Sequence, residues 1–200
     1  MTAAALPTRE DALALMQSWT PSESLRKHML AVEAGMRAYA IHFGEDEPRW
    51  ALTGLLHDFD YERFPNAAQS AHSEHPFEGV RHLRTLGYPD DICTAILGHA
   101  LYSGVPRESR MAKVLFAVDE LCGLITAAAL VRPSRSVMDL EAASVKKKMK
   151  DKGFARGVSR EDVVNGAADL SVELDAHIAF VIEAMRLSAP ALGLAGPSPS

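Results

Sequence analysis

Several histidine and aspartate side chains that can bind divalent metal ions lie in apolar segments of the chain. These candidates are His28, His57, Asp58, His75, His99 and Asp119. The adjacent pair His57-Asp58 is the most informative, because Leu55 and Leu56 precede it and place it at the inner end of a core helix. A buried carboxylate is costly unless it is paired or coordinates a cation. The pair therefore predicts a bound metal, and imidazole with carboxylate suits Fe, Mn, Co, Ni or Zn.

Asp119 supports the same interpretation from a different segment. It lies in the apolar run KVLFAVDELCGLI, and at the helical period it shares a face with Leu115 and Cys122. The side chain should therefore point inward. An inward aspartate without a partner would destabilise the fold or stay protonated.

The order of these residues resembles the H…HD…D signature of the HD-domain metal-dependent phosphohydrolases. His28 precedes His57 by 29 residues, and Asp58 precedes Asp119 by 61. The segment LLHDFDYERFP stands where that family has LLHDIGK-like text, and the resemblance covers roughly residues 22–131. Further on, HPFEGVRHL and AILGHA resemble the HDIG-type subgroup, whose extra histidines bind a second metal. The chain departs from the pattern in one place, because HDFD replaces HDIG(K) and the lysine is absent.

The resemblance implies two metal ions that share one aspartate. His28, His57, Asp58 and Asp119 would bind the first ion, and Asp58, His75 and His99 the second, with Mg also allowed as the metal. His72 and His82 lie in the same stretch as His75 and stay open as alternatives to it. Two such ions activate a water molecule for in-line attack on phosphorus. Asp58 is thus a catalytic candidate, and Asp60 is either a general base or a cap of the loop.

Basic residues near these motifs are candidates for substrate binding. Arg63 follows the HD pair and is expected to line the pocket mouth, while Arg107, Arg110 and Lys113 precede Asp119 and are expected to contact a phosphate group. Tyr61 is a further candidate for the pocket mouth. The segment from Lys146 to Arg160 holds seven basic residues and one acid. It is either a solvated helix and turn or a positive rim that attracts an anionic substrate.

The expected function is metal-dependent hydrolysis of a phosphomonoester or phosphoanhydride in a nucleotide or small metabolite. Two alternatives stay open: an HD-fold di-iron oxygenase and a non-catalytic nucleotide-binding module. The expected partner is a small phosphorylated molecule. A nucleic acid is not expected because the formal charge is −5, and a membrane is not expected because no apolar run is long enough to cross a bilayer. A homodimer through the apolar helix Leu121–Val131 is a further expectation.

The elements that position these residues are all predicted to be helices. Thr20-Pro21-Ser22-Glu23 matches a capping box, and the helix it opens should end at Gly44. Further helices are expected over residues 47–58, 75–86, 89–99, 110–131 and 137–150, with one or two over 160–187. Residues 59–73 form a loop. No β-type alternation of useful length occurs, so the fold class is all-α, an HD-domain helical bundle with a C-terminal helical extension.

Composition agrees with one globular protein. The chain has 200 residues, of which 48% are hydrophobic and 24% charged. We expect a single HD-type domain over residues 1–187, with the signature core at 22–131, accessory helices at 132–187 and a disordered tail at 188–200. A cytoplasmic location is expected because no secretory signal is visible and Cys93 and Cys122 fit buried free thiols. His42 and His177 are expected at the surface or at helix ends.

Overall fold

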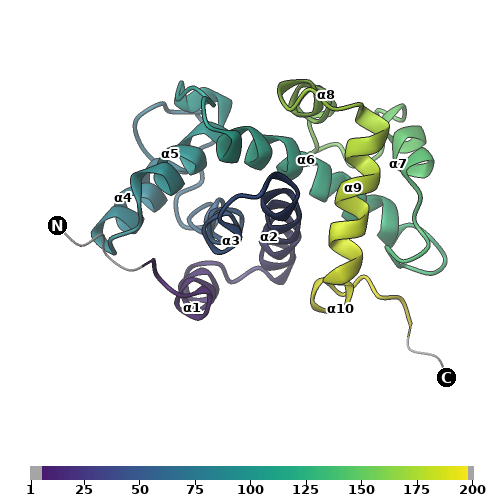
Figure 1. Cartoon of the computed structure of the whole chain (residues 1–200), viewed down its shortest axis with the longest axis horizontal. Helices are drawn as coiled ribbons and strands as arrows, with labels where there is room; N and C mark the ends of the chain where they lie inside the picture. Colours follow the sequence, from purple (N-terminus) through teal and green to yellow (C-terminus); the bar gives the residue numbers. More distant parts are fainter. Residues whose placement is uncertain (1–5, 198–200) are drawn as a thin grey trace.

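The computed structural model describes residues 6–197, and these form only helices and their connections (Figure 1). The α-helices are α1 (Arg9–Trp19), α2 (Glu23–Phe43), α3 (Glu47–Leu56), α4 (Phe77–Thr85), α5 (Asp90–His99), α6 (Arg110–Leu130), α7 (Ala142–Met149), α8 (Arg160–Asp169), α9 (Leu174–Leu187) and α10 (Ala189–Leu192), with a 3-10 turn at Leu101–Ser103. No strand occurs within residues 6–197. The predicted all-α class is confirmed.

Helices α2, α3, α5 and α6 pack on one another and form the centre of the molecule (Figure 1). Helix α6 is buried on most sides, as its nearly continuous apolar sequence predicts. Small residues allow the close approach of α2 to its neighbours. A methyl group on Gly35 would lie 3.3 Å from Val118 of α6, and one on Gly54 would lie 3.0 Å from the backbone of Glu33.

The start of α2 corrects one sequence prediction. Its N-cap is Ser22, whose hydroxyl accepts a hydrogen bond from the backbone N–H of Leu25. Thr20 does not cap the helix, because its buried hydroxyl donates to the carbonyl of Phe59 instead. That bond ties the segment before α2 to the turn that follows His57-Asp58. The other end is as expected, since Gly44 adopts the left-handed conformation with φ of 69°.

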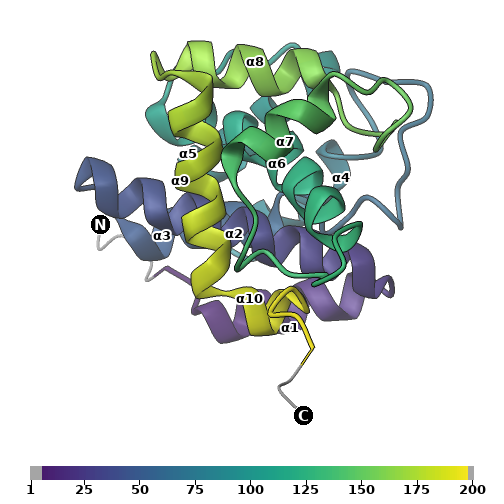
Figure 2. The same ribbon diagram turned by 90° about the vertical axis from the view of Figure 1, so that its right-hand side faces the viewer.

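The C-terminal helices cover α6 and α2. Figure 2 shows α8 across the top of the molecule, with α9 running down from it towards α10. A methyl group on Gly166 of α8 would lie 2.5 Å from the backbone of Ala117, so α8 lies directly on α6. Helix α7 is shorter than the predicted 137–150. Asp139 accepts hydrogen bonds from the side chains of Arg132 and Ser134, and these bonds hold the preceding residues in turns.

The prediction of a disordered tail over 188–200 is wrong for residues 188–196. Three apolar side chains, Ala189, Leu192 and Leu194, are buried there. The carbonyl of Leu194 also accepts hydrogen bonds from the N–H of Val137 and the hydroxyl of Ser136. Burial of these side chains holds a segment whose composition alone resembles a flexible tail. Residues 198–200 lie outside the described residues.

Two predictions about single side chains have different outcomes. The prediction that His177 lies at the surface is wrong, because its ring is buried between the hydroxyl of Tyr39 and the carbonyl of Ala117. Burial lowers its pKa. Cys93 and Cys122 are buried free thiols, as predicted. Among residues 6–197, no helix combines the length and the apolar character that crossing a membrane requires.

Candidate metal centre

The fold brings together all six candidate ligands, which come from five segments of the chain. They are His28 in α2, His57 and Asp58 at the end of α3, His75 before α4, His99 at the end of α5 and Asp119 in α6. They form two groups, and within each group the candidate ligand atoms lie within 4.8 Å of one another. His28, His57 and Asp119 make up the first group, and Asp58, His75 and His99 the second. Each group could hold a metal ion.

Asp58 lies between the two groups and faces both. Its Oδ2 is 3.5 Å from Nε2 of His57 and 3.9 Å from Nε2 of His28. Its Oδ1 is 3.3 Å from Nε2 of His75 and 3.4 Å from Nε2 of His99. The two oxygens of one carboxylate therefore point towards different pairs of histidines, which is the geometry of a bridging ligand.

The histidines present the same atom, Nε2, to the carboxylates. Asp119 Oδ1 is 3.0 Å from Nε2 of His28 and 3.4 Å from Nε2 of His57. On the far side of its ring, His57 donates its Nδ1–H to the carbonyl of Gly54 at 2.8 Å, and His99 donates to the carbonyl of Ile96. Because the proton is held on Nδ1, the lone pair of Nε2 is directed inward. Metal-binding histidines are held in this way.

One atom of the centre fits a metal ion directly. Nε2 of His57 is fully buried and makes no hydrogen bond with any described residue. Its contacts with Asp58 and Asp119 are close but lack hydrogen-bond geometry. Buried polar atoms without a partner are rare, and each calls for an explanation such as a bound ion. A divalent cation would supply the missing partner for this nitrogen and for both carboxylates.

The electrostatics of the centre agree with this fit. Burial by itself would lower the pKa of His57, but the carboxylates of Asp58 and Asp119 outweigh it and raise that pKa to about 9. Burial would raise the pKa of each carboxyl, yet the surrounding histidines hold both below their usual values. Without a metal the protein therefore balances two buried carboxylates with protons on histidine. A metal ion would replace those protons.

The loop between α3 and α4 contains the residues that hold His75. Asp60 is 1% exposed, and its Oδ1 accepts the Nδ1–H of His75 at 2.7 Å. Its Oδ2 accepts the N–H of Gly79 at 2.7 Å. Gly79 lets α4 approach closely, since a methyl group there would lie 2.6–2.9 Å from the carboxylate atoms of Asp60. Both oxygens of this candidate general base are thus engaged in orienting other groups.

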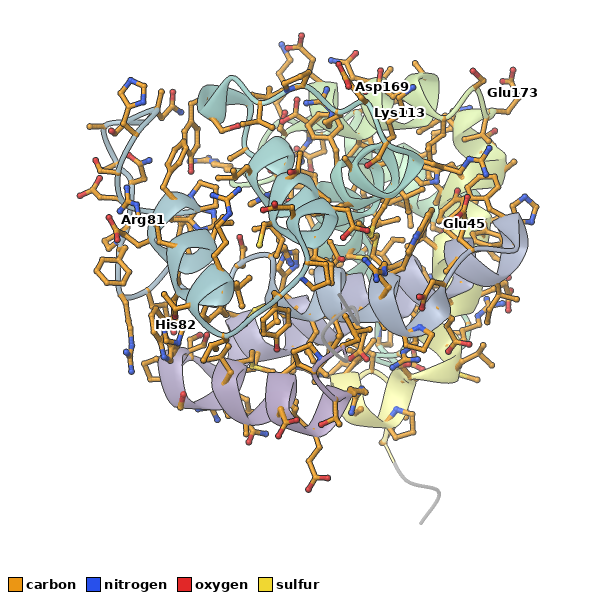
Figure 3. All side chains as sticks on the ribbon, turned by 60° about the vertical axis from the view of Figure 1, so that its left-hand side comes forward. Glu45, Arg81, His82, Lys113, Asp169 and Glu173 are labelled. Atoms are coloured by element: carbon orange, nitrogen blue, oxygen red, sulfur yellow. The ribbon has the colours of Figure 1, made fainter. Side chains whose placement is uncertain are left out.

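The two alternatives to His75 lie elsewhere. His82 stacks on Trp19 with ring centroids 4.5 Å apart, and Figure 3 shows it beside α1 at the edge of the molecule. His72 is exposed in the loop. Of the three histidines in this stretch, the structure brings only His75 to Asp58.

A pocket of about 470 Å³ opens over the two groups of ligands. Besides the ligands, its walls contain Tyr61, Gln69, Ala100, Leu101, Tyr102, Glu120, Gly123, Val158 and Asp162. Tyr102 donates its hydroxyl to the carbonyl of His75, and the ring of Tyr61 lies 5.1 Å from that of His75. Burial, followed by the charge of Asp119, raises the pKa of Glu120 to about 7. No lysine or arginine of residues 6–197 lines this pocket.

The four basic residues expected at the substrate lie outside the pocket. Arg63 lies over the ring of Trp19 at 4.3 Å and donates to the carbonyl of Ser18. Arg107 lies over the ring of Phe116 and pairs with Asp169, and Arg110 pairs with Glu45. Lys113 is half-buried on α6 and does not line the pocket. The structure therefore does not place these four residues in contact with the metal centre.

The pocket residues differ in how well the sequence indicates them. Glu120 follows Asp119 directly and Tyr102 follows His99 by three residues, so both are indicated by their position beside candidate ligands. Val158 and Asp162 lie about 40 residues from the nearest ligand in the chain. They reach the pocket only because α8 packs on α6, and that packing is not evident from local sequence.

Comparison with known proteins identifies the family. The HD domain family model matches residues 25–124, a segment that contains all six candidate ligands. The chain therefore belongs to the HD-domain family, which confirms the resemblance noted in its sequence. No curated protein and no solved structure matches the chain.

Proposed function

We propose that this protein is a metal-dependent phosphohydrolase with a dinuclear metal centre that cleaves a phosphomonoester or phosphoanhydride of a small molecule. The observation that carries the proposal is the position of Asp58, whose two oxygens face His57 and His28 on one side and His75 and His99 on the other. Membership of the HD-domain family supports the same chemistry.

Two sets of residues would hold the metals. His28, His57 and Asp119 would bind one ion, His75 and His99 the other, and Asp58 both. When bound, the ions supply Lewis acidity and lower the pKa of a water molecule. Fe, Mn, Co, Ni and Zn suit this mixture of imidazole and carboxylate, and Mg remains a candidate.

The other residues of the site orient and shield. Asp60 accepts the Nδ1–H of His75 and so directs the opposite nitrogen of that ring inward. We assign it a positioning role in place of general base, because the N–H of Gly79 occupies its second oxygen. Leu101 and Val158 contribute apolar side chains to the pocket wall.

The test is phosphate release by the metal-reconstituted protein from a panel of phosphomonoesters, pyrophosphate and nucleotides, with each of the six metals. Asp58→Ala should lose the activity, because both metal positions lose a ligand. His82→Ala is the matched control and should retain the activity. It removes a histidine from the same stretch of chain as His75, but this histidine stacks on Trp19 and does not face Asp58.

Two outcomes would overturn the proposal. One is the absence of phosphate release from every substrate with every metal. The other is a di-iron form that consumes O₂ with an organic substrate and releases no phosphate, which would establish the oxygenase alternative.

A further inference from the structure

The pocket over the metal centre is unusual for a site that binds a phosphorylated molecule, because its side walls are acidic. Glu120 and Asp162 line it, and no lysine or arginine of the described residues does. Phosphate-binding sites commonly use arginine or lysine to hold the phosphate oxygens. In this pocket the bound metals would be the positive groups nearest to the phosphate.

The basic residues of the segment 146–160 do not enter the pocket either. Lys146 pairs with Asp175, and Lys148 lies over the ring of Phe154. The guanidinium of Arg160 donates to backbone carbonyls of the loop before α8, including those of Ala155 and Val158. These contacts shape the loop that carries Val158 into the pocket wall.

Ser159 holds the side chain of Glu120 and the backbone of Asp162. Oε2 of Glu120 accepts the backbone N–H of Ser159 at 3.1 Å. The hydroxyl of Ser159 in turn accepts the N–H of Asp162 and caps α8. Neither carboxylate forms an ion pair with any residue between 6 and 197. The wall therefore presents two carboxylates that no cation among the described residues pairs with, and that of Glu120 is held by a hydrogen bond.

The other residues of the pocket indicate where each part of a substrate would lie. The unpartnered Nε2 of His57 and the carboxylates around it mark the metal side of the site, which would take the phosphate group. Tyr61 and Tyr102 line the same pocket beside His75. A leaving group attached to that phosphate would extend towards the tyrosines and the acidic residues that line the same pocket.

We propose that Glu120 and Asp162 are specificity-determining residues, and that the substrate is a phosphomonoester whose leaving group carries an ammonium or another hydrogen-bond donor. This inference rests on the proposed function and narrows its substrate class. A donor of that kind satisfies both acceptors. The charge of Asp162 repels a leaving group with a further phosphate or carboxylate, because no basic side chain of the pocket compensates the added charge.

The experiment compares two esters of equal size, 2-aminoethyl phosphate and 2-carboxyethyl phosphate, with the metal-loaded protein. The ratio of their kcat/KM values should favour the amine by about tenfold or more. Asp162→Asn and Glu120→Gln should each reduce that ratio by about fivefold. Glu161→Gln is the matched control, since it removes a charge from the same turn of α8 on an exposed side chain outside the pocket, and it should leave the ratio unchanged.

A second readout does not depend on turnover. The phosphonates 2-aminoethylphosphonate and 2-carboxyethylphosphonate have a C–P bond that hydrolysis does not cleave, and calorimetry measures their binding to the metal-loaded protein. The wild type should bind the amine more tightly by a similar factor, and Asp162→Asn should remove most of the difference.

The outcomes separate this inference from the function on which it rests. Equal hydrolysis of both esters, or a preference for the carboxylate or for pyrophosphate, overturns the inference and leaves the hydrolase standing. A preference that persists in both Asp162→Asn and Glu120→Gln also overturns the assignment of these residues. Absence of phosphate release with preferential binding of the amine overturns the hydrolase and supports the acidic wall as a selective surface.

Discussion

Replacement of Asp60 by asparagine separates a positioning role from a catalytic one. Asp60 is nearly inaccessible and accepts two hydrogen bonds of 2.7 Å, from Nδ1–H of His75 and from N–H of Gly79. Asparagine has the same shape but only one acceptor oxygen, so one of the two donors would face the amide NH₂ group. Asp60→Asn therefore changes the orientation of His75 without opening a cavity.

The size of the effect follows from the bond that is lost. An unsatisfied buried donor costs about 1–3 kcal/mol. Loss of the partner of a metal-binding histidine lowers metal affinity by about 10–100-fold, which corresponds to about 1.4–2.7 kcal/mol. We expect this loss at the metal position formed by Asp58, His75 and His99. The position formed by His28, His57 and Asp119 should keep its affinity within about threefold.

The assay is calorimetric titration of metal into the metal-free variant, followed by phosphate release at increasing metal concentration. Two binding events are expected, one of them weakened, and activity should return towards the wild-type level when excess metal fills the weakened position. Helical circular dichroism should be unchanged. Unchanged affinities at both positions together with lost activity would refute the reasoning and make Asp60 a general base.

Three further predictions address the same centre. Gly79→Ala should weaken the metal position formed by Asp58, His75 and His99 and lower the free energy of unfolding by about 1–3 kcal/mol in urea denaturation, because the new methyl group overlaps the Asp60 carboxylate. Gly157→Ala should change neither the metal affinity nor the free energy of unfolding, because a methyl group there would have no atom within 4 Å. Equal effects of the two substitutions would contradict the packing argument. Arg63→Ala should leave KM within about twofold in steady-state assays, since its guanidinium lies over Trp19, whereas a large rise in KM would place it at the substrate. Metal affinity should rise as pH increases from about 6 to about 9, because the pKa of His57 in the metal-free protein is raised to about 9 and its proton must leave before metal binds. Calorimetry in buffers of different ionisation enthalpy measures the released proton. A metal affinity that does not change with pH would contradict this view of the site.

Residues whose type conflicts with their surroundings are the most informative part of this sequence. Asp58 and Asp119 are acids in apolar helices, and this conflict is visible without a structure. The close approach of α2 and α6 could also be anticipated from Gly35, where a methyl group would lie 3.3 Å from Val118. Such features depend on residues within one or two helical turns.

Features that depend on packing between distant segments could not be predicted. His177 has an ordinary amphipathic context, yet the contact between α9 and α2 buries it against Tyr39. Arg107 precedes the candidate ligand Asp119 in the chain, yet its guanidinium lies over the ring of Phe116 and pairs with Asp169 of α8. The acidic wall depends on Asp162, which the packing of α8 on α6 brings to the pocket.

The metal content of the purified protein tests the central claim most directly. Protein prepared without chelator or affinity-tag metal and then reconstituted should hold two metal ions per chain by elemental analysis. His75→Ala should hold one, and His82→Ala, which alters a histidine stacked on Trp19, should still hold two. Absence of bound metal in the reconstituted wild type, or loss of an ion from His82→Ala but not from His75→Ala, would contradict the account.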